Sequence, residues 1–295
     1  MRKILLVLAL FFNAALSAQN FDWWANLVKW DGVTSWKQYI TYSARYMGPN
    51  AIPVPSMANG SADSTDQFSI AGVFHFSEGD HAQNLTLSAN YCLVKNLISF
   101  DAAWIPVEWY QMSHSIKEER HVFSDNYYDR KAKGDVLFNM NIQLLNRWRR
   151  YVQLALRAGY RFPTSSGVGA ARYTNAPGYY FDLSAGKFLS ASNRLKLTGM
   201  LGFYVWQLNE AGQDDAFMFG AGLEYNHKGW HWEMNGAGYL GYLVNGDRPI
   251  VFRSALEKKF NKVTARISFS QGLNDYKYTG LEAGTKFIFA GKKNN

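Results

Sequence analysis

Residues 194–206 read RLKLTGMLGFYVW, and apolar and polar side chains alternate along most of this stretch. Successive side chains of a β-strand point to opposite sides of a sheet, so the alternation divides these residues between two faces. The apolar face holds Leu195, Leu197, Leu201, Phe203 and Val205. The other face holds Arg194, Lys196, Thr198, Tyr204 and Trp206. The pattern therefore predicts a β-strand with one apolar face.

The same pattern recurs from residue 66 to residue 289. It predicts twelve strands, at residues 66–76, 84–94, 97–110, 134–145, 148–162, 177–189, 193–206, 215–226, 229–242, 250–260, 262–270 and 278–289. Alternation alone does not say which face is buried. The apolar face of a soluble sandwich packs inward, whereas in a barrel within a bilayer it meets lipid and the polar face lines the lumen.

The connections between the strands distinguish these two folds. Several are tight turns with an asparagine, a residue that tolerates the left-handed backbone of a hairpin. These asparagines are Asn96, Asn146, Asn193, Asn226 and Asn261. Other connections are longer, up to residues 111–133. Short turns at one end and long loops at the other are typical of transmembrane barrels, whose turns face the periplasm. The chain is therefore predicted to be all-β, an antiparallel up-and-down transmembrane β-barrel of about 12 strands over residues 66–289.

In this architecture the chain resembles Gram-negative outer-membrane β-barrel proteins, without pointing to a narrower family. The resemblance implies a location in the cell outer membrane, contact with its lipid and lipopolysaccharide, and recognition by the insertion machinery. Such barrels close on an aromatic-rich last strand, and the last predicted strand here contains Phe287 and Phe289. A basic tail, residues 290–295, follows that strand.

The first residues read as a secretory signal peptide, residues 1–18. Arg2 and Lys3 precede an apolar run at residues 4–12, and small residues follow before Gln19. The apolar run is too short for a spanning helix, which needs roughly 20 residues.

Residues 19–65 do not share the barrel pattern. Their first part is rich in tryptophan and could form a short amphipathic helix at a membrane surface. Residues 36–47 alternate like a strand, so the wall would have 14 strands if this stretch and residues 20–31 both joined it. The favoured alternative is a periplasmic segment or a plug inside the lumen.

The bulk composition excludes several classes of site. The formal net charge of +8 suits an anionic partner, such as lipopolysaccharide or an anionic solute, but the basic residues are too dispersed for a nucleic-acid site. The lone Cys92 excludes an intrachain disulfide and a cysteine-based metal centre. No cofactor or metal site is expected.

The polar faces of the predicted strands supply the candidate lumen-lining residues. These are Arg157, Asp182, Lys196, Glu224, His231, Glu233, Arg253, Glu257, Arg266, Glu282 and Lys286. Hairpin register predicts a cluster of Glu257, Arg266 and Glu282, which is either a charge filter or an ion-pair network that fills a narrow barrel. The turn at residues 226–229 similarly predicts that Glu224 faces His231.

The sequence favours a non-enzymatic function. Outer-membrane phospholipases carry a Ser–His–Asn set on the outer wall, but the strand pattern turns His75 and Ser77 inward. The leading prediction is a narrow channel or porin-like protein for small solutes, with no catalytic residues. A non-catalytic accessory subunit of a cell-envelope assembly is the alternative, because the tryptophan-rich segment and the basic tail would be free to bind a protein partner. A barrel lipid hydrolase is a third and weaker possibility.

Overall fold

The structure is a computed structural model, and it describes residues 22–122, 130–145, 152–189, 192–208 and 212–289. The predicted signal peptide at residues 1–18, the basic tail at residues 290–295 and the turn residue Asn146 lie outside these ranges.

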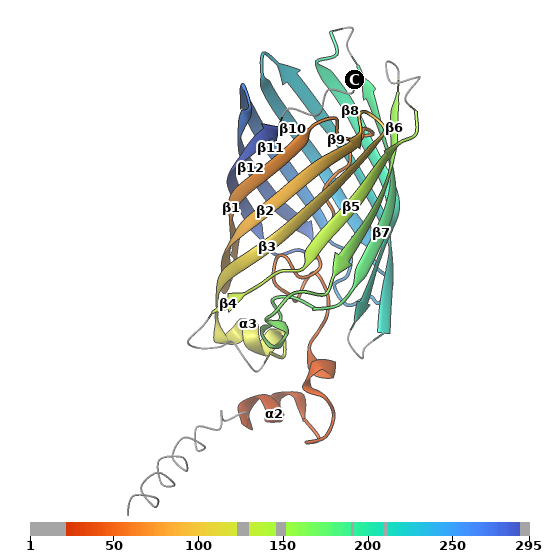
Figure 1. Cartoon of the computed structure of the whole chain (residues 1–295). Coiled ribbons are helices and arrows are strands. Elements are labelled where there is room, and N and C mark those ends of the chain that lie inside the picture. The colour runs from red at the N-terminus through yellow and green to blue at the C-terminus, as the bar shows by residue number, and fades with distance from the viewer. Residues whose placement is uncertain (1–21, 123–129, 146–151, 190–191, 209–211, 290–295) are drawn as a thin grey trace, which may run out of the picture.

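The described residues form a barrel preceded by a short helical segment (Figure 1). The helices are α2 (Asp22–Val28) and α3 (His114–Glu119), with short 3-10 helices at η1 (Trp36–Tyr39) and η2 (Val168–Ala170). The strands are β1 (Asp66–Ser77), β2 (Asp80–Val94), β3 (Ile98–Met112), β4 (Lys131–Ala132), β5 (Val136–Gln143), β6 (Gln153–Phe162), β7 (Gly178–Phe188), β8 (Leu195–Leu208), β9 (Gly212–His227), β10 (Trp230–Leu240), β11 (Ile250–Phe260), β12 (Val263–Asn274) and β13 (Thr279–Phe289).

Twelve of these strands close into a ring in which each pairs antiparallel with its neighbours in the sequence. Closure is made by β1 and β13, where Asp66 pairs with Phe289 and Phe76 pairs with Thr279. The two-residue β4 pairs with β3 outside this ring. The structure confirms the predicted all-β barrel of 12 strands.

The alternative of 14 wall strands is wrong. Residues 36–39 form the 3-10 helix η1, and residues 40–47 contain no strand. Ile40, Tyr42 and Ala44 are buried without being paired in the wall.

Of the four predicted asparagine turns that lie among the described residues, three form. Asn96, Asn193 and Asn261 have φ angles of 59°, 51° and 57°, the left-handed backbone that a tight hairpin requires. Asn226 lies within β9, and the β9–β10 hairpin turns instead on Lys228 and Gly229, whose φ angles are 48° and 77°. This turn lies further along the chain than the sequence suggested, which changes the pairing of the residues beside it.

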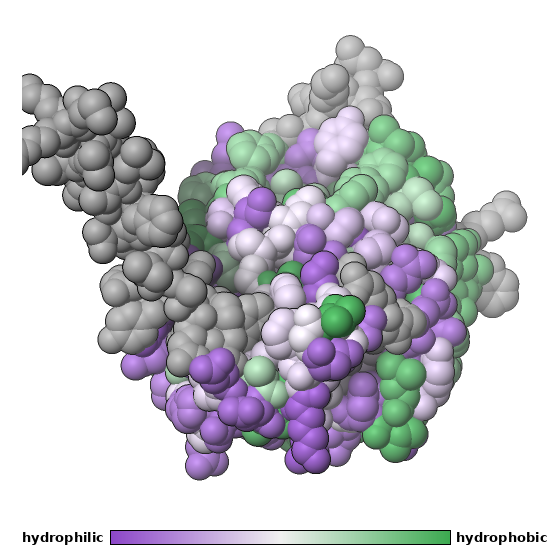
Figure 2. Space-filling model, turned by 90° about the horizontal axis from the view of Figure 1, so that it is seen from below, coloured by the Kyte–Doolittle hydropathy of each residue, from purple (hydrophilic) through white to green (hydrophobic). Residues whose placement is uncertain are grey.

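The barrel is apolar on its outer wall and polar inside. Leu201 and Ile267 are each 60% exposed, whereas Arg157 and Asp182 on neighbouring strands are nearly buried. This is the reverse of a soluble protein, and it suits a wall that meets lipid. Figure 2, a view onto the end that carries α2, shows hydrophilic residues across much of that end and hydrophobic residues gathered along part of its rim.

The two ends of the barrel differ. We call the end with the β2–β3, β7–β8, β9–β10 and β11–β12 connections the turn end, and the opposite end the loop end. The loop end carries residues 113–135, which include α3, together with residues 163–177 and 241–249. The start of β1 and the end of β13 both lie at the turn end, and α2 lies beyond the loop end (Figure 1).

The outward position of Leu201 gives a test of the membrane fold. Leu201→Arg is expected to destabilise the barrel by about 2–4 kcal/mol in lipid vesicles, because a charge near the middle of the lipid-facing wall must leave water. Leu201→Ile is the control and keeps the apolar surface. Urea unfolding followed by tryptophan fluorescence measures both. Equal stability of the two variants would contradict a lipid-facing outer wall.

Candidate functional site

The lumen is filled by the segment that precedes the first strand. We call residues 40–65 the lumenal segment. Eight of its apolar residues are almost completely buried: Ile40, Tyr42, Ala44, Met47, Ala51, Ile52, Val54 and Ala62. Since none of them belongs to the wall, their burial places the segment inside the ring of strands (Figure 1).

Side chains of the wall and of the loops at its end hold this segment through its backbone carbonyls. The Arg253 guanidinium donates to the Val54 carbonyl at 2.7 Å, and the Arg157 guanidinium donates to the Ser56 carbonyl at 2.9 Å. Further donors act in the same way: Tyr276 to Pro49 at 3.3 Å, Arg161 to Ala51, Tyr239 to Ile52 at 3.0 Å and Gln143 to Gly60 at 2.9 Å. A buried extended chain without strand partners needs such donors, because unpaired carbonyls are costly to bury.

A network of buried charges closes the lumen near the loop end. Arg172 forms ion pairs with Asp80 at 2.6 Å and with Glu108 at 2.8 Å, and Arg120 pairs with the same Asp80 at 2.6 Å. All four side chains are at most 2% exposed. The Asn50 amide donates to Glu108 at 2.8 Å, so the lumenal segment is part of this network. We call these four charged residues the loop-end network.

The loop-end network shifts the pKa of Arg172 and of its neighbour Tyr173, both in the loop at residues 163–177. Burial by itself would lower the pKa of the Arg172 guanidinium, but Glu108 and Asp80 outweigh it and hold that pKa well above its ordinary value. Burial and the charge of Glu108 raise the pKa of the Tyr173 hydroxyl well above its ordinary value. The hydroxyl therefore keeps its proton and donates it to Glu108 at 2.9 Å.

The sequence did not point to the loop-end network. Arg120 and Arg172 come from long loops, whose residues have no periodicity from which a direction can be inferred. The carboxylates were the available signal. Asp80 and Glu108 both lie near the open end of the β2–β3 hairpin, on positions that face the lumen without a nearby Lys or Arg in either strand.

The second charge cluster is centred on Arg266 of β12. Its guanidinium pairs with Glu257 of β11, with Glu282 of β13 at 3.0 Å and with Glu233 of β10 at 2.9 Å. Lys286 pairs with Glu257 at 2.6 Å. The structure thus brings together the three residues expected to cluster and adds two more. Arg266 lies directly opposite Glu257 in the ladder and reaches Glu282 diagonally, because Glu282 faces Ser268. We call these five residues the Arg266 cluster.

The expected contact between Glu224 and His231 is wrong. Glu224 lies opposite Glu233, and His231 lies opposite Asn226, whose side-chain oxygen is 2.8 Å from the His231 ring. The cause is the β9–β10 turn at Lys228 and Gly229, which shifts the register. Glu224 instead pairs with Lys196 at 3.7 Å.

The remaining candidates also lie in the lumen. Arg157 pairs with Asp182 at 2.6 Å, and both face the lumenal segment. Arg253 contacts the Val54 carbonyl, and within the described part of the chain it forms no ion pair. His75 is 6% exposed and lies 2.9 Å from the Asn84 side-chain oxygen, so it is inside the barrel rather than on the outer wall.

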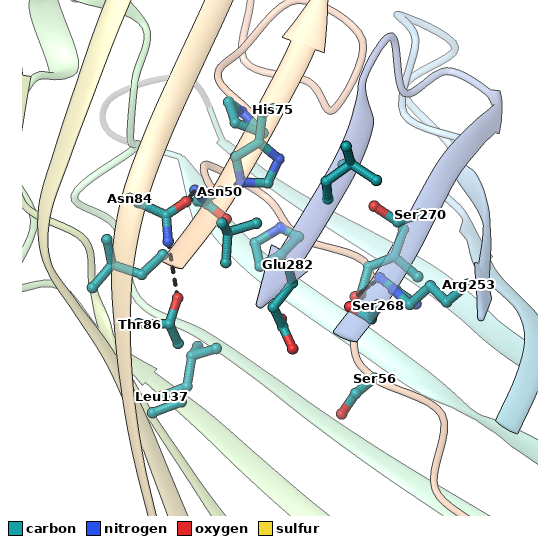
Figure 3. Close-up of a pocket in the computed structure, with 18 of the residues that line it drawn as sticks. Asn50, Ser56, His75, Asn84, Thr86, Leu137, Arg253, Ser268, Ser270 and Glu282 are labelled. Atoms are coloured by element: carbon teal, nitrogen blue, oxygen red, sulfur yellow. Dashed lines mark hydrogen bonds between the residues drawn. The ribbon is translucent and has the colours of Figure 1, made fainter. Parts of the chain in front are cut away.

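Two cavities lie between the lumenal segment and the wall. One of about 320 Å³ is lined by His75, Asn84, Arg253, Ser268 and Ser270 among others. Figure 3 shows Asn84 and Thr86 on one side of it and Arg253, Ser268 and Ser270 on the other. A second of about 450 Å³ lies nearer the turn end and is lined by Asp63, Asp101, Asn141 and Lys286 among others.

The two cavities share Arg266 and Glu282 in their linings. A polar space therefore extends along one side of the lumenal segment and is interrupted by the Arg266 cluster. The loop-end network lies beyond its other end, since Asn84 and Asn50 line the first cavity and Asn50 contacts Glu108.

The described residues lack two other kinds of feature. None of their helices is both long and apolar enough to cross a membrane. No group of three or more His, Cys, Asp or Glu side chains among them is arranged to hold a metal ion.

Comparison with protein families and with curated proteins finds no match to this sequence. Solved structures do match. The NanC porin superposes with a TM-score of 0.52 at 10% identity, covering 75% of this chain and 100% of the porin. The COG4313 outer membrane channel from Pseudomonas putida F1 superposes with a TM-score of 0.53 at 12% identity, covering 80% of this chain and 100% of the channel. At such low identity the likeness shows the fold alone, which is that of an outer-membrane β-barrel.

Arg172 gives a test of the loop-end network. Arg172→Met is expected to destabilise the barrel by about 3–5 kcal/mol, because it leaves two buried carboxylates with too little positive charge. The control is Arg45→Met, since Arg45 is 48% exposed and its pair with Asp275 at 3.4 Å is expected to contribute about 0–1 kcal/mol. Urea unfolding in detergent micelles measures the difference. If the two variants lose equal stability, the network does not hold the loop end together.

Proposed function

We propose that this protein is a narrow outer-membrane channel for small polar solutes, which its own lumenal segment closes at rest. The proposal rests on one observation, which is that the lumen is polar and is occupied by the lumenal segment. The wall is lined with ionisable side chains, and a segment that is not part of the wall lies among them. The barrel fold shared with known channels supports a transport function, and an open pore would not suit a lumen occupied in this way.

The contacts of the lumenal segment suit a removable plug. Many of its attachments to the wall are separate hydrogen bonds from side chains to its carbonyls, and each contributes on the order of 1 kcal/mol. The two cavities leave one side of it unpacked against β1, β2 and β12. A segment that served only to fill the barrel would pack against the wall on every side, as protein interiors do.

The mixed charge of the lumen suits polar solutes. The Arg266 cluster offers one guanidinium, one ammonium and three carboxylates between the two cavities. A solute that followed this route would exchange part of its hydration shell for contacts with these groups. The cluster would therefore select passing solutes by their charge.

An accessory role in a cell-envelope assembly is the second candidate. Trp30 is 40% exposed, Leu27 is 42% exposed and Val33 is 89% exposed, all in the segment before the barrel. These apolar side chains suit contact with a protein partner. Lipopolysaccharide and the outer-membrane insertion machinery also remain expected partners, and no enzymatic activity is proposed.

Gly60 gives a test of the plug in the full-length protein. A Cβ at Gly60 would lie 2.5 Å from the Gly186 nitrogen and 2.8 Å from the Gln153 carbonyl oxygen, and its φ of +83° disfavours other residues. Gly60→Ala is expected to weaken the closed state by about 1–3 kcal/mol. Channel opening in planar bilayers should then rise about 5- to 150-fold, since 1.4 kcal/mol is a factor of 10.

The matched control is Gly32→Ala. Gly32 has a similar φ of +79°, but a Cβ there would meet no atom within 4 Å. Its conductance should equal that of the unchanged protein. If Gly60→Ala conducts no more than Gly32→Ala, the lumenal segment is not a gate and the accessory role is favoured.

Arg266 tests whether the charge cluster filters solutes. In the Gly60→Ala background, Arg266→Gln should shift the reversal potential in a salt gradient towards cation selectivity, because three carboxylates lose their guanidinium. Lys187→Gln removes the same charge from an exposed position on β7 and should leave the potential unchanged. An unchanged potential in both variants would assign the cluster a purely structural role.

A further inference from the structure

We propose that residues 22–39 are displayed on the outside of the cell, and that the lumenal segment is the stem that carries them through the barrel. The proposal shares with the proposed function the placement in the outer membrane, but it does not require that any solute passes. It rests on the direction in which the chain crosses the lumen.

The lumenal segment leads directly into β1 at the turn end. Asp66 pairs with Phe289 at the start of β1, and the Asn90 amide donates to the Thr65 carbonyl at 2.7 Å. Residues just before this point contact the same half of the barrel. The Asp63 backbone N–H donates to the Ser99 hydroxyl at 3.2 Å, next to the β2–β3 turn.

Earlier residues of the segment contact the opposite end. The Gly48 N–H donates to the Ala171 carbonyl at 2.8 Å, and the Arg45 N–H donates to the Gly246 carbonyl at 3.1 Å. Ala171 and Gly246 belong to two of the three long connections of the loop end. Residues 45–65 therefore cross the barrel from its loop end to its turn end.

The residues before the lumenal segment lie outside the barrel at the loop end. The Trp24 indole donates to the His121 carbonyl at 2.7 Å, and the His121 ring lies 3.1 Å from the Tyr39 carbonyl oxygen. The Trp23 ring contacts the ring of His114, at the start of α3. Residues 22–39 thus contact the loop that contains α3, and Figure 1 shows α2 beyond α3 at this end of the barrel.

The lengths of the connections between strands indicate which end of the barrel faces the outside of the cell. Transmembrane barrels have short periplasmic turns and longer extracellular loops. The turn end carries two-residue connections at residues 228–229 and 261–262, whereas the loop end carries residues 113–135 and 163–177. The loop end is therefore assigned to the outside, and residues 22–39 with it. A periplasmic position for this part of the chain, one of the two expected from the sequence, does not suit this path.

The experiment is labelling of single cysteines in intact cells with a maleimide carried on polyethylene glycol, which is too bulky for the lumen. Cys92→Ser provides the background without the native thiol. Val33→Cys reports on the displayed segment, because Val33 is 89% exposed. Glu78→Cys in the β1–β2 connection marks the loop end, and Lys262→Cys in the β11–β12 connection marks the turn end; both positions are exposed.

The expected result is labelling of Val33→Cys and Glu78→Cys in intact cells, and of Lys262→Cys only after the outer membrane is permeabilised. Labelling of Glu78→Cys but not Val33→Cys in intact cells would show that the segment does not cross the lumen. Labelling of Lys262→Cys in intact cells, with the other two protected, would show that the barrel has the opposite orientation. Either outcome overturns the proposal.

These outcomes are distinguishable from failure of the channel. Labelling does not depend on conductance, so a surface-labelled but non-conducting protein would overturn the proposed function alone. All three positions are exposed and make no described side-chain contact to the lumen, and heat-dependent gel mobility of each variant checks that its barrel is folded.

Discussion

The need to satisfy backbone carbonyls inside a closed barrel governs this structure. A chain that crosses the lumen without joining the sheet has no ladder to pair with, so its polar groups must find side chains. The wall and its adjoining loops supply guanidinium, phenol and amide donors along the length of the lumen, from Tyr276 near the loop end to Gln143 near the turn end. An apolar lining would offer the carbonyls of this chain no donors. The need for donors therefore explains why the lining is so polar.

The charges of the lumen are organised around this chain. The loop-end network draws two loop arginines over the carboxylates of β2 and β3, and it excludes water almost completely. The Arg266 cluster is only about three-quarters buried and borders both cavities. One group of charges is therefore suited to holding the end of the barrel shut, and the other remains within reach of a solute. Buried ion pairs gain little over apolar packing, so their presence favours specific geometry over stability.

Much of the wall could be predicted because strand geometry converts sequence directly into position. The stretch at residues 194–206 corresponds to β8, and the close turn at Asn261 places Glu257 opposite Arg266 without further information. The errors have equally local causes. Because the β9–β10 turn was expected too early in the sequence, His231 was predicted to face Glu224, whereas it lies opposite Asn226. Arg120 and Arg172 were missed because loops have no period, and Arg172 meets Asp80 across 92 residues of sequence. The alternation of residues 36–47 resembled a wall strand, but Tyr42, Ser43 and Ala44 are all buried in succession and none of them has a strand partner.

The direct connection from Thr65 into Asp66 has a kinetic consequence. A lumenal segment that left its site would remain covalently attached to the wall, at an effective concentration on the order of millimolar for a short flexible tether. Its return would be a unimolecular step, independent of how many copies the cell makes. A solute occupying the two cavities would compete with the lumenal segment, which cannot diffuse away. The segment would therefore return to its site after each displacement without the help of a second protein.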